Sequence, residues 1–274
     1  MTRPLVIDTF PIHDELDMLE MRLTELYDAV DWFVAVEADV THQDRPKPYY
    51  LTESLDRFAP FVDKLIVVRA TGLPTVEDDD DPWARELSQR GYISEGLEQI
   101  GVSGADVILH GDLDEIPRAM YARMVRPQPG WFVSFQQRMH CFAIDWVHPD
   151  PWFGTVAGQA SSVRALGNNL NCFARMRDKR NRWQQPGSNV HPAPLQDSGW
   201  HFTWLGGRTS ALKKVASFCH PEVADYALVG LEDDIFYREG LHVDGRKQSP
   251  CEVDDTYPRW IQEGRAPRAW YRPR

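Results

Sequence analysis

The sequence has no apolar run long enough to cross a bilayer. Its longest apolar stretches, Trp32 to Val36 and Leu65 to Val68, are far shorter than the roughly 20 residues that a membrane-spanning helix needs. The chain opens on Met-Thr-Arg-Pro and enters a strand-like run at once, without the apolar region and cleavage site of a secretory signal. We therefore expect no transmembrane segment and a cytoplasmic protein.

Closely paired cysteines and an excess of basic residues are also lacking. The four cysteines, Cys141, Cys172, Cys219 and Cys251, form no C-x-x-C pair, which disfavours both a structural zinc site and a disulfide framework. We expect reduced, mostly buried thiols. Thirty Lys and Arg face 41 Asp and Glu, and the net charge of −11 repels polyanions, so nucleic acid is a poor candidate partner.

What is present is the composition of a folded domain, with 42% hydrophobic and 26% charged residues in 274. Short apolar runs alternate with helical patterns in the first half, and this alternation predicts an α/β fold with a mostly parallel sheet flanked by helices. The predicted strands are 5–7, 32–36, 65–68, 107–109 and 131–135, and the predicted helices are 14–27, 82–100, 210–220 and part of 226–239. Residues 161–194 are loop-rich. We expect one domain over 1–274.

Charged residues stand directly after four of the predicted strands: Asp8, Glu37, Arg69 and Asp112. Ligands of open parallel sheets bind outside the carboxyl ends of the strands. One charged residue there is ordinary, but four in succession indicate a polar ligand site. A run of five acids, Glu77 to Asp81, has no apolar anchors beside it and is typical of a solvated loop.

The segment His110 to Pro117 places three carboxylates within four residues after a buried strand. Like charges so close together need a cation or hydrogen-bond donors to compensate them. Hard oxygen ligands on a tight turn suit Mg²⁺ or Mn²⁺, and an Asp-x-Asp pair of this kind is typical of nucleotide-sugar sites. The alternative is a solvated acidic turn.

Several motifs, in the same order along the chain, resemble glycosyltransferase family 17, which contains the animal enzyme that adds the bisecting N-acetylglucosamine to N-glycans. They cover roughly residues 5–205 and comprise Asp8-Thr9-Phe10-Pro11, the helix pattern of 14–26, Val36-Glu37-Ala38, Pro46-Lys47-Pro48, Asp112-x-Asp114-Glu115-Ile116-Pro117 and Gly199-Trp200-His201-x-x-Trp204. The resemblance implies a GT-A type fold, a UDP-N-acetylglucosamine donor, a divalent metal and inversion at the anomeric carbon. We expect no counterpart of the animal enzyme's membrane anchor, and the match fades after about Gly206.

The candidate metal ligands follow from the acidic turn. Asp114 is the first expected ligand, and Asp112 either shares the metal or binds a ribose hydroxyl. Glu115 is expected to support the ligands from behind. The resemblance carries His201, which completes the coordination as a neutral imidazole unless it is a core histidine among aromatic residues.

The expected nucleotide contacts come from strand ends and from the predicted helix before the acidic turn. Asp8 and Glu37 are expected to bind uracil or ribose, with Thr9 and Phe10 lining that pocket. Arg85 and Arg90 are placed to bind a diphosphate, for which a guanidinium is well shaped, unless they pair with Glu86 on the helix surface. Residues 1–118 form the expected nucleotide-sugar half and 119–274 the acceptor half.

Inverting transfer also needs a carboxylate that takes the proton of the acceptor hydroxyl. Glu232, Asp233 and Asp234 form the best remaining cluster and resemble the Glu-Asp-Asp run that supplies the base in β-1,4-galactosyltransferases. The alternative for them is a helix start decorated with favourable acids. Asp145 is the reserve candidate.

Ten tryptophans include five in the loop-rich second half: Trp146, Trp152, Trp183, Trp200 and Trp204. Aromatic rings stack on sugars, so these suit an acceptor site, although core packing explains at least half of them. The prediction is a metal-dependent, inverting glycosyltransferase acting on a carbohydrate or a glycosylated small molecule. The alternatives are a sugar-nucleotide hydrolase or nucleotidyltransferase and a non-catalytic carbohydrate-binding protein.

Overall fold

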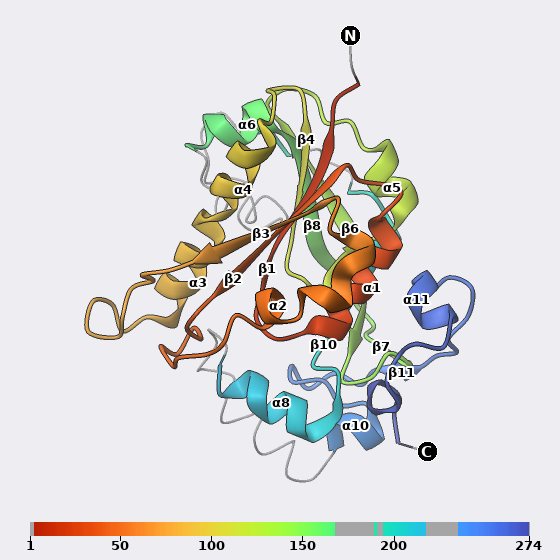
Figure 1. Cartoon of the computed structure of the whole chain (residues 1–274). Helices are drawn as coiled ribbons and strands as arrows, with labels where there is room; N and C mark the ends of the chain where they lie inside the picture. The colour runs from red at the N-terminus through yellow and green to blue at the C-terminus, as the bar shows by residue number, and fades with distance from the viewer. Residues whose placement is uncertain (1–2, 168–188, 191–193, 218–234, 274) are drawn as a thin grey trace.

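The structure is a computed structural model and describes residues 3–167, 189–190, 194–217 and 235–273. A nine-stranded sheet runs through its centre in the order β3-β2-β1-β4-β8-β6-β10-β5, with β9 beside β6 (Figure 1). A second, two-stranded sheet pairs β7 with β11. The strands are β1 Val6–Ile12, β2 Trp32–Ala38, β3 Leu65–Ala70, β4 Val107–His110, β5 Glu115–Pro117, β6 Trp131–Cys141, β7 Trp146–Val147, β8 Trp152–Gln159, β9 Asn189–Val190, β10 Gly199–Thr203 and β11 Ser249–Pro250.

The central sheet is mostly parallel. Strands β3, β2, β1 and β4 run the same way, as do β6 and β10, whereas β8 is antiparallel to both β4 and β6 and β5 is antiparallel to β10. Strands β1 and β2 are almost continuously buried, as expected for strands that helices cover on both faces. The predicted α/β class, with a mostly parallel sheet flanked by helices, is confirmed.

Helices cover the two faces of the sheet. Helices α3, α4 and α6 lie on one face, and α1, α5 and α11 lie on the other, while α8 and α10 lie beyond the carboxyl ends of the parallel strands (Figure 1). The helices are α1 Leu16–Leu26, α2 Tyr50–Glu53, α3 Pro82–Gly91, α4 Ile93–Ile100, α5 Ala119–Met124, α6 Ala160–Ala165, α8 Gly207–Val215, α10 Ile235–Glu239 and α11 Arg259–Gln262, with 3₁₀ turns at Leu55–Phe61 and Arg268–Trp270.

Each face has its own apolar core. On the α1 side, buried side chains of α1 and β1 join Trp200 and Trp260, and on the α4 side Val34 and Val68 pack under α4. Gly96 allows α4 to lie close to β2, because a Cβ at this position would lie 2.4 Å from Cγ1 of Val34.

Several element boundaries differ from those predicted. Strand β1 continues to Ile12, so Asp8 lies inside the strand and not after it, and Glu37 likewise lies inside β2. The predicted helix 82–100 is two helices that meet at Tyr92. Strand β8 was not predicted, because its small and polar residues, Gly154 and Gly158 among them, carry no strong strand pattern.

Other predictions agree with the described residues. All of Glu77 to Asp81 is exposed, and the Asp81 carboxylate accepts a hydrogen bond from the Trp83 N–H at the start of α3. Cys141 is buried and Cys251 half-buried, and both are free thiols; Cys172 and Cys219 lie outside the described residues. Within the described ranges, no helix is both long and apolar enough to span a membrane.

Candidate active site

The acidic turn links β4 to β5 and is built tightly. Gly111 has no room for a side chain, because a Cβ there would lie 2.8 Å from Oε2 of Glu115 and 3.0 Å from Oγ1 of Thr155. Glu115 is fully buried: its Oε2 accepts from the Asp112 N–H at 2.8 Å, and its Oε1 accepts from the Trp152 indole at 2.6 Å. Glu115 therefore shapes the turn from behind, as predicted.

Strand pairing brings the turn to His201, which lies far away in the sequence. Glu115 of β5 is opposite His201 of β10, and the Phe202 N–H donates to the Asp114 carbonyl at 2.9 Å. The His201 Nε2 lies 3.5 Å from Oδ1 of Asp114. The imidazole stacks on the Trp152 ring, with 4.7 Å between ring centroids, and its buried Nδ1 has no hydrogen-bond partner in the described structure.

Lys214 of α8 is a residue of this site that the sequence analysis missed. Its Nζ lies 3.6 Å from Oδ2 of Asp114 and donates to Oγ1 of Thr203 at 3.0 Å. Burial alone would raise the pKa of Asp114, but the charges of His201 and Lys214 outweigh it and lower that pKa. Asp114 is thus held as a carboxylate. The sequence pattern predicted a helix over 210–220, but it gave no reason to choose Lys214 over the neighbouring Lys213.

Asp112 lies beside a second cation, Arg90 of α3. The Arg90 guanidinium pairs with both the Asp112 and Glu86 carboxylates, and its Nη1 lies 3.1 Å from Nε2 of His110. Burial acts to lower the pKa of Arg90, but the two carboxylates raise it by more. The alternative given for Arg90, a salt bridge with Glu86, is present, while its expected contact with a diphosphate stays a prediction. About a third of the Asp112 side chain is exposed.

Asp8, Thr9 and Phe10 require a correction. Asp8 is fully buried, and both its oxygens accept from the Arg22 guanidinium at 2.7 Å. The Thr9 hydroxyl donates to the Leu109 carbonyl, and the buried Phe10 ring lies 4.7 Å below the Arg22 guanidinium. None of the three reaches a surface that a nucleotide could touch, because β1 runs on past them to Ile12.

Arg22 itself is a second missed residue. Besides pairing with Asp8, its Nη1 lies within 3.1 Å of the carbonyl oxygens of Asp112, Leu113 and Glu115. The buried ion pair therefore anchors the backbone of the acidic turn to α1 and β1. No pattern in the sequence distinguishes this arginine from a surface residue of a helix.

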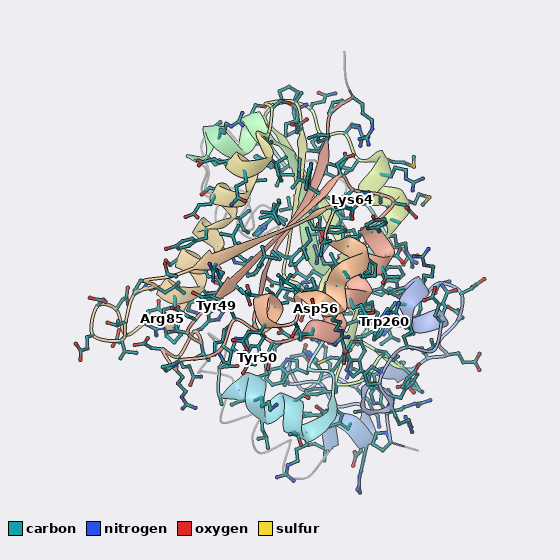
Figure 2. The ribbon with its side chains drawn as sticks, in the orientation of Figure 1. Tyr49, Tyr50, Asp56, Lys64, Arg85 and Trp260 are labelled. Atoms are coloured by element: carbon teal, nitrogen blue, oxygen red, sulfur yellow. The ribbon has the colours of Figure 1, made fainter. Side chains whose placement is uncertain are left out.

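Glu37 and Arg85 are corrected for the same reason. The buried Glu37 carboxylate accepts from the N–H groups of Leu51 and Thr52, so it caps the start of α2. The buried Arg85 donates to the carbonyl oxygens of His42, Pro74 and Asp79 and holds the loop before α3. Figure 2 shows Arg85 beside α3 and that loop, to one side of α8.

The carboxyl end of β1 carries a different set of polar residues: His13, Asp14 and Glu15, with Lys47 close by. Burial lowers the pKa of His13, while partial desolvation and the Glu15 charge raise that of Asp14. The charge of Lys214 contributes to lowering the pKa of His13, and the charge of Glu15 contributes to raising the pKa of Lys214.

The candidate bases are only partly described. Glu232, Asp233 and Asp234 lie outside the described residues. The reserve candidate, Asp145, accepts from the Arg272 backbone N–H at 2.8 Å and from its guanidinium at 3.0 Å. Arg272 thus engages both oxygens of Asp145, which argues against Asp145 as the base.

The tryptophans divide between site and core. Trp152 stacks on His201, whereas Trp146, Trp200 and Trp204 are buried, and Trp183 lies outside the described residues. Trp200 lies in the core on the α1 side with the Arg118 guanidinium 4.3 Å above its ring. Of the four described, Trp152 is therefore the one placed beside the acidic turn.

These features define an α/β protein with a charged site at the carboxyl ends of its parallel strands. The chain belongs to glycosyltransferase family 17, whose sequence profile matches residues 1–221. The predicted family is thereby confirmed. The match ends shortly after α8, so α10 and the C-terminal segment lie beyond it.

Two curated relatives are the β-1,4-mannosyl-glycoprotein 4-β-N-acetylglucosaminyltransferases of Rattus norvegicus and Homo sapiens, 26% and 25% identical over 264 residues. The alignments cover 88% of this chain but only 45% and 46% of the relatives, so the chain spans under half of their length. Among solved structures, a 4-diphosphocytidyl-2C-methyl-D-erythritol synthase is similar over 73% of this chain and 90% of its own, with 14% identity and a TM-score of 0.40.

Proposed function

We propose that the chain is an inverting glycosyltransferase that moves N-acetylglucosamine, or a related sugar, from a UDP donor to a hydroxyl of a carbohydrate or glycosylated small molecule. The family match and the names of the relatives support the transferase and the sugar. The observation that carries the site is the pairing of β5 with β10, which holds Asp114 and His201 together with Lys214 at the strand ends.

Asp114 and His201 fit a divalent metal, Mn²⁺ or Mg²⁺. Their donor atoms, a carboxylate oxygen and an imidazole nitrogen, lie 3.5 Å apart and are of kinds that bind such ions. Asp112 already pairs with the guanidinium of Arg90. Asp112 therefore suits a ribose hydroxyl or an outer position better than a shared place on the metal.

Each charged residue has a part in binding the donor. The metal, when bound, stabilises the negative charge that develops on the departing diphosphate. Lys214 and Arg90 add fixed positive charge on either side of the turn, and Trp152 keeps the His201 imidazole oriented. Arg22 holds the carbonyls of the turn in place beneath them.

Residues 1–118 form the nucleotide-sugar half in this proposal, and 119–274 form the acceptor half. Because Asp8 and Glu37 are buried, the uracil and ribose contacts move to the true end of β1, where His13, Asp14 and Lys47 are at least partly exposed. The base that takes the acceptor proton is proposed among Glu232, Asp233 and Asp234, since Asp145 is ion-paired with Arg272.

The test is UDP binding with and without Mn²⁺, followed by transfer from UDP-N-acetylglucosamine to a panel of acceptors. Asp114→Asn should weaken Mn²⁺-dependent UDP binding by about 100-fold or more, because it removes a ligand charge. Asp254→Asn, which removes an exposed carboxylate from the same chain, is the matched control and should bind as the parent does. Unchanged UDP affinity in Asp114→Asn would contradict the proposal.

Lys214→Met separates a metal-dependent site from one that uses the lysine as its cation. If a metal binds at Asp114, removing the neighbouring ammonium should strengthen Mn²⁺ binding, because it removes a like charge. If Lys214 itself replaces the metal, the same substitution should abolish UDP binding and Mn²⁺ should not restore it. Hydrolysis of the UDP-sugar without transfer to any acceptor would favour a sugar-nucleotide hydrolase. Binding of a sugar without binding of the nucleotide would favour a carbohydrate-binding protein.

A further inference from the structure

A cluster of two imidazoles and one carboxylate lies apart from the acidic turn, in the second half of the chain. It comprises His148, which follows β7, and His242 and Asp244, which lie on the turn before β11. One donor atom from each lies within 4.8 Å of the other two, and in the described part of the chain this is the one such group of three. Neither the family motifs nor the proposed transfer reaction uses these residues.

His148 is positioned as a ligating imidazole. Its backbone N–H donates to the Met139 carbonyl at 2.8 Å, and its Nδ1 lies 3.1 Å from both the carbonyl oxygen and the backbone nitrogen of Asp150. The Asp150 N–H donates to Nδ1 in one tautomer of the imidazole, and Nδ1 can donate to the Asp150 carbonyl in the other. When Nδ1 carries the hydrogen and donates it to that carbonyl, the lone pair of Nε2 points into the cluster. A hydrogen bond from the other ring nitrogen to a backbone carbonyl is the usual arrangement of metal-bound histidines.

The Nε2 atom of His148 is buried next to Asp244. The side chain is 2% exposed, and Nε2 has no hydrogen-bond partner in the described structure. It lies 3.3 Å from Oδ2 of Asp244. That separation is the edge of a tetrahedron whose centre is about 2.0 Å from each corner, which is the bond length of zinc to nitrogen and carboxylate oxygen.

A tight turn presents the other two donors. The His242 N–H donates to the Arg246 carbonyl at 2.8 Å and the Gly245 N–H to the His242 carbonyl at 2.9 Å, with Gly245 in the left-handed region at φ +83°. The His242 Nδ1 lies 2.8 Å from Oδ1 of Asp244, and its ring meets that of His148 edge-on at 4.6 Å. The donors are therefore fixed before any ion arrives.

Arg246 is the competitor for this position. Its guanidinium lies 2.5 Å from Oδ2 of Asp244 and also pairs with Asp150. About half of the Arg246 side chain is exposed, so it can turn toward solvent when another cation approaches Asp244. The alternative is that Arg246 is the permanent partner and that the histidines only pack the turn.

We propose that His148, His242 and Asp244 bind a zinc ion or a similar transition metal, with a fourth position open to water or another ligand. Two imidazoles and one carboxylate favour such ions over Mg²⁺ or Mn²⁺, which prefer oxygen donors. The bound ion fastens the turn of 242–246 to the segment after β7. It is separate from the divalent ion proposed at Asp114.

The experiment is calorimetric titration of chelator-treated, tag-free protein with Zn²⁺, together with the visible absorption of the Co²⁺ form. Asp114→Asn, which removes a ligand of the other proposed metal site, should bind one equivalent of Zn²⁺, and the parent chain should bind at least one. His148→Ala and Asp244→Asn should each lose more than about tenfold in affinity. Asp254→Asn and Asp114→Asn should retain the site, which separates this proposal from the one for the acidic turn.

Arg246→Met distinguishes the ion from the arginine. With a metal site, removing the guanidinium should increase Zn²⁺ affinity severalfold, because it removes a competitor for Asp244. Absence of stoichiometric Zn²⁺ binding by both the parent and Arg246→Met would overturn the proposal, as would unchanged affinity in His148→Ala. Circular dichroism of each variant establishes that a loss of binding is not a loss of folding.

Discussion

The two halves of the chain treat buried polar groups differently. Before residue 118, buried charges are satisfied within the fold, as in the Asp8–Arg22 pair and the Glu37 cap of α2. After it, the described structure buries imidazole and indole nitrogens without partners. The buried side-chain atoms that lack a hydrogen-bond partner are Oγ1 of Thr24 in the first half and, in the second, Oε1 of Gln137, Nε2 of His140 and His148, Nδ1 of His201 and Nε1 of Trp200 and Trp260.

This difference has a functional meaning. A buried polar atom without a partner costs about 1–3 kcal/mol, so its presence calls for a reason such as a ligand or an ion. One of these atoms, Nε2 of His148, is a proposed zinc ligand, and another, Nδ1 of His201, is the second ring nitrogen of the imidazole whose Nε2 faces Asp114. The first half thus pairs its buried charges within the fold and supplies the acidic turn of the proposed donor site, whereas most of the unpartnered buried atoms lie in the second half.

The largest expected effect is loss of the buried ion pair in the first half. Asp8→Asn leaves the fully buried Arg22 guanidinium without its counter-charge, and we expect the free energy of unfolding to fall by about 3–5 kcal/mol. Urea denaturation measures it. The matched control is Asp17→Asn, whose partner Arg57 is about as exposed as Asp17 itself, and it should cost less than about 1 kcal/mol.

The next effect concerns the second half and depends on pH. Burial lowers the pKa of His140 to about 4 from a usual value of 6.5. Between pH 6.5 and pH 4 the unfolded chain therefore binds a proton at His140 that the folded chain does not bind. As a result, the free energy of unfolding decreases as the pH falls below 6.5, by up to about 3 kcal/mol near pH 4. His140→Gln should lose less between these pH values in denaturant titrations. Parallel losses in parent and variant would show that other groups cause the decline.

The smallest effect tests whether Glu37 only supports the fold. Glu37→Gln replaces a charged acceptor of two N–H groups at the start of α2, and we expect a loss of about 1–3 kcal/mol in the free energy of unfolding. The affinity for UDP should stay the same. If UDP binding weakened while the free energy of unfolding stayed the same, Glu37 would be a nucleotide contact after all. The conclusion that the buried charges of the first half serve the fold would then be wrong for Glu37.

The sequence predicted the architecture and the acidic turn, because both depend on local patterns. Buried strands such as Trp32–Val36 and a carboxylate pair after β4 are visible within a few residues. Strand ends were less visible: the prediction stopped β1 at Ile7, whereas the strand runs to Ile12, so Asp8 was assigned to a strand end that lies four residues further on. The position of Asp8 inside the strand could be recognised only once its ion-pair partner, Arg22, was known.

The missed residues all act across long sequence separations. Lys214 reaches Asp114, and Arg22 reaches the carbonyls of 112–115, through packing that no local pattern encodes. His148 and His242 come together only because β7 pairs with β11. His201 was predicted because it belongs to the family motif of residues 199–204, whereas its neighbours in the sequence alone gave no sign of its role.

The pairing of β5 with β10 has a consequence for synthesis of the chain. Asp114 emerges early, together with the four parallel strands, whereas His201 and the strand that aligns it arrive only after residues 199–203 have been added. A nascent or truncated chain that stops before β10 would display the acidic turn without its imidazole. Competence to hold a ligand at this turn therefore arises in one late step, so shortened translation products carry the scaffold without the site.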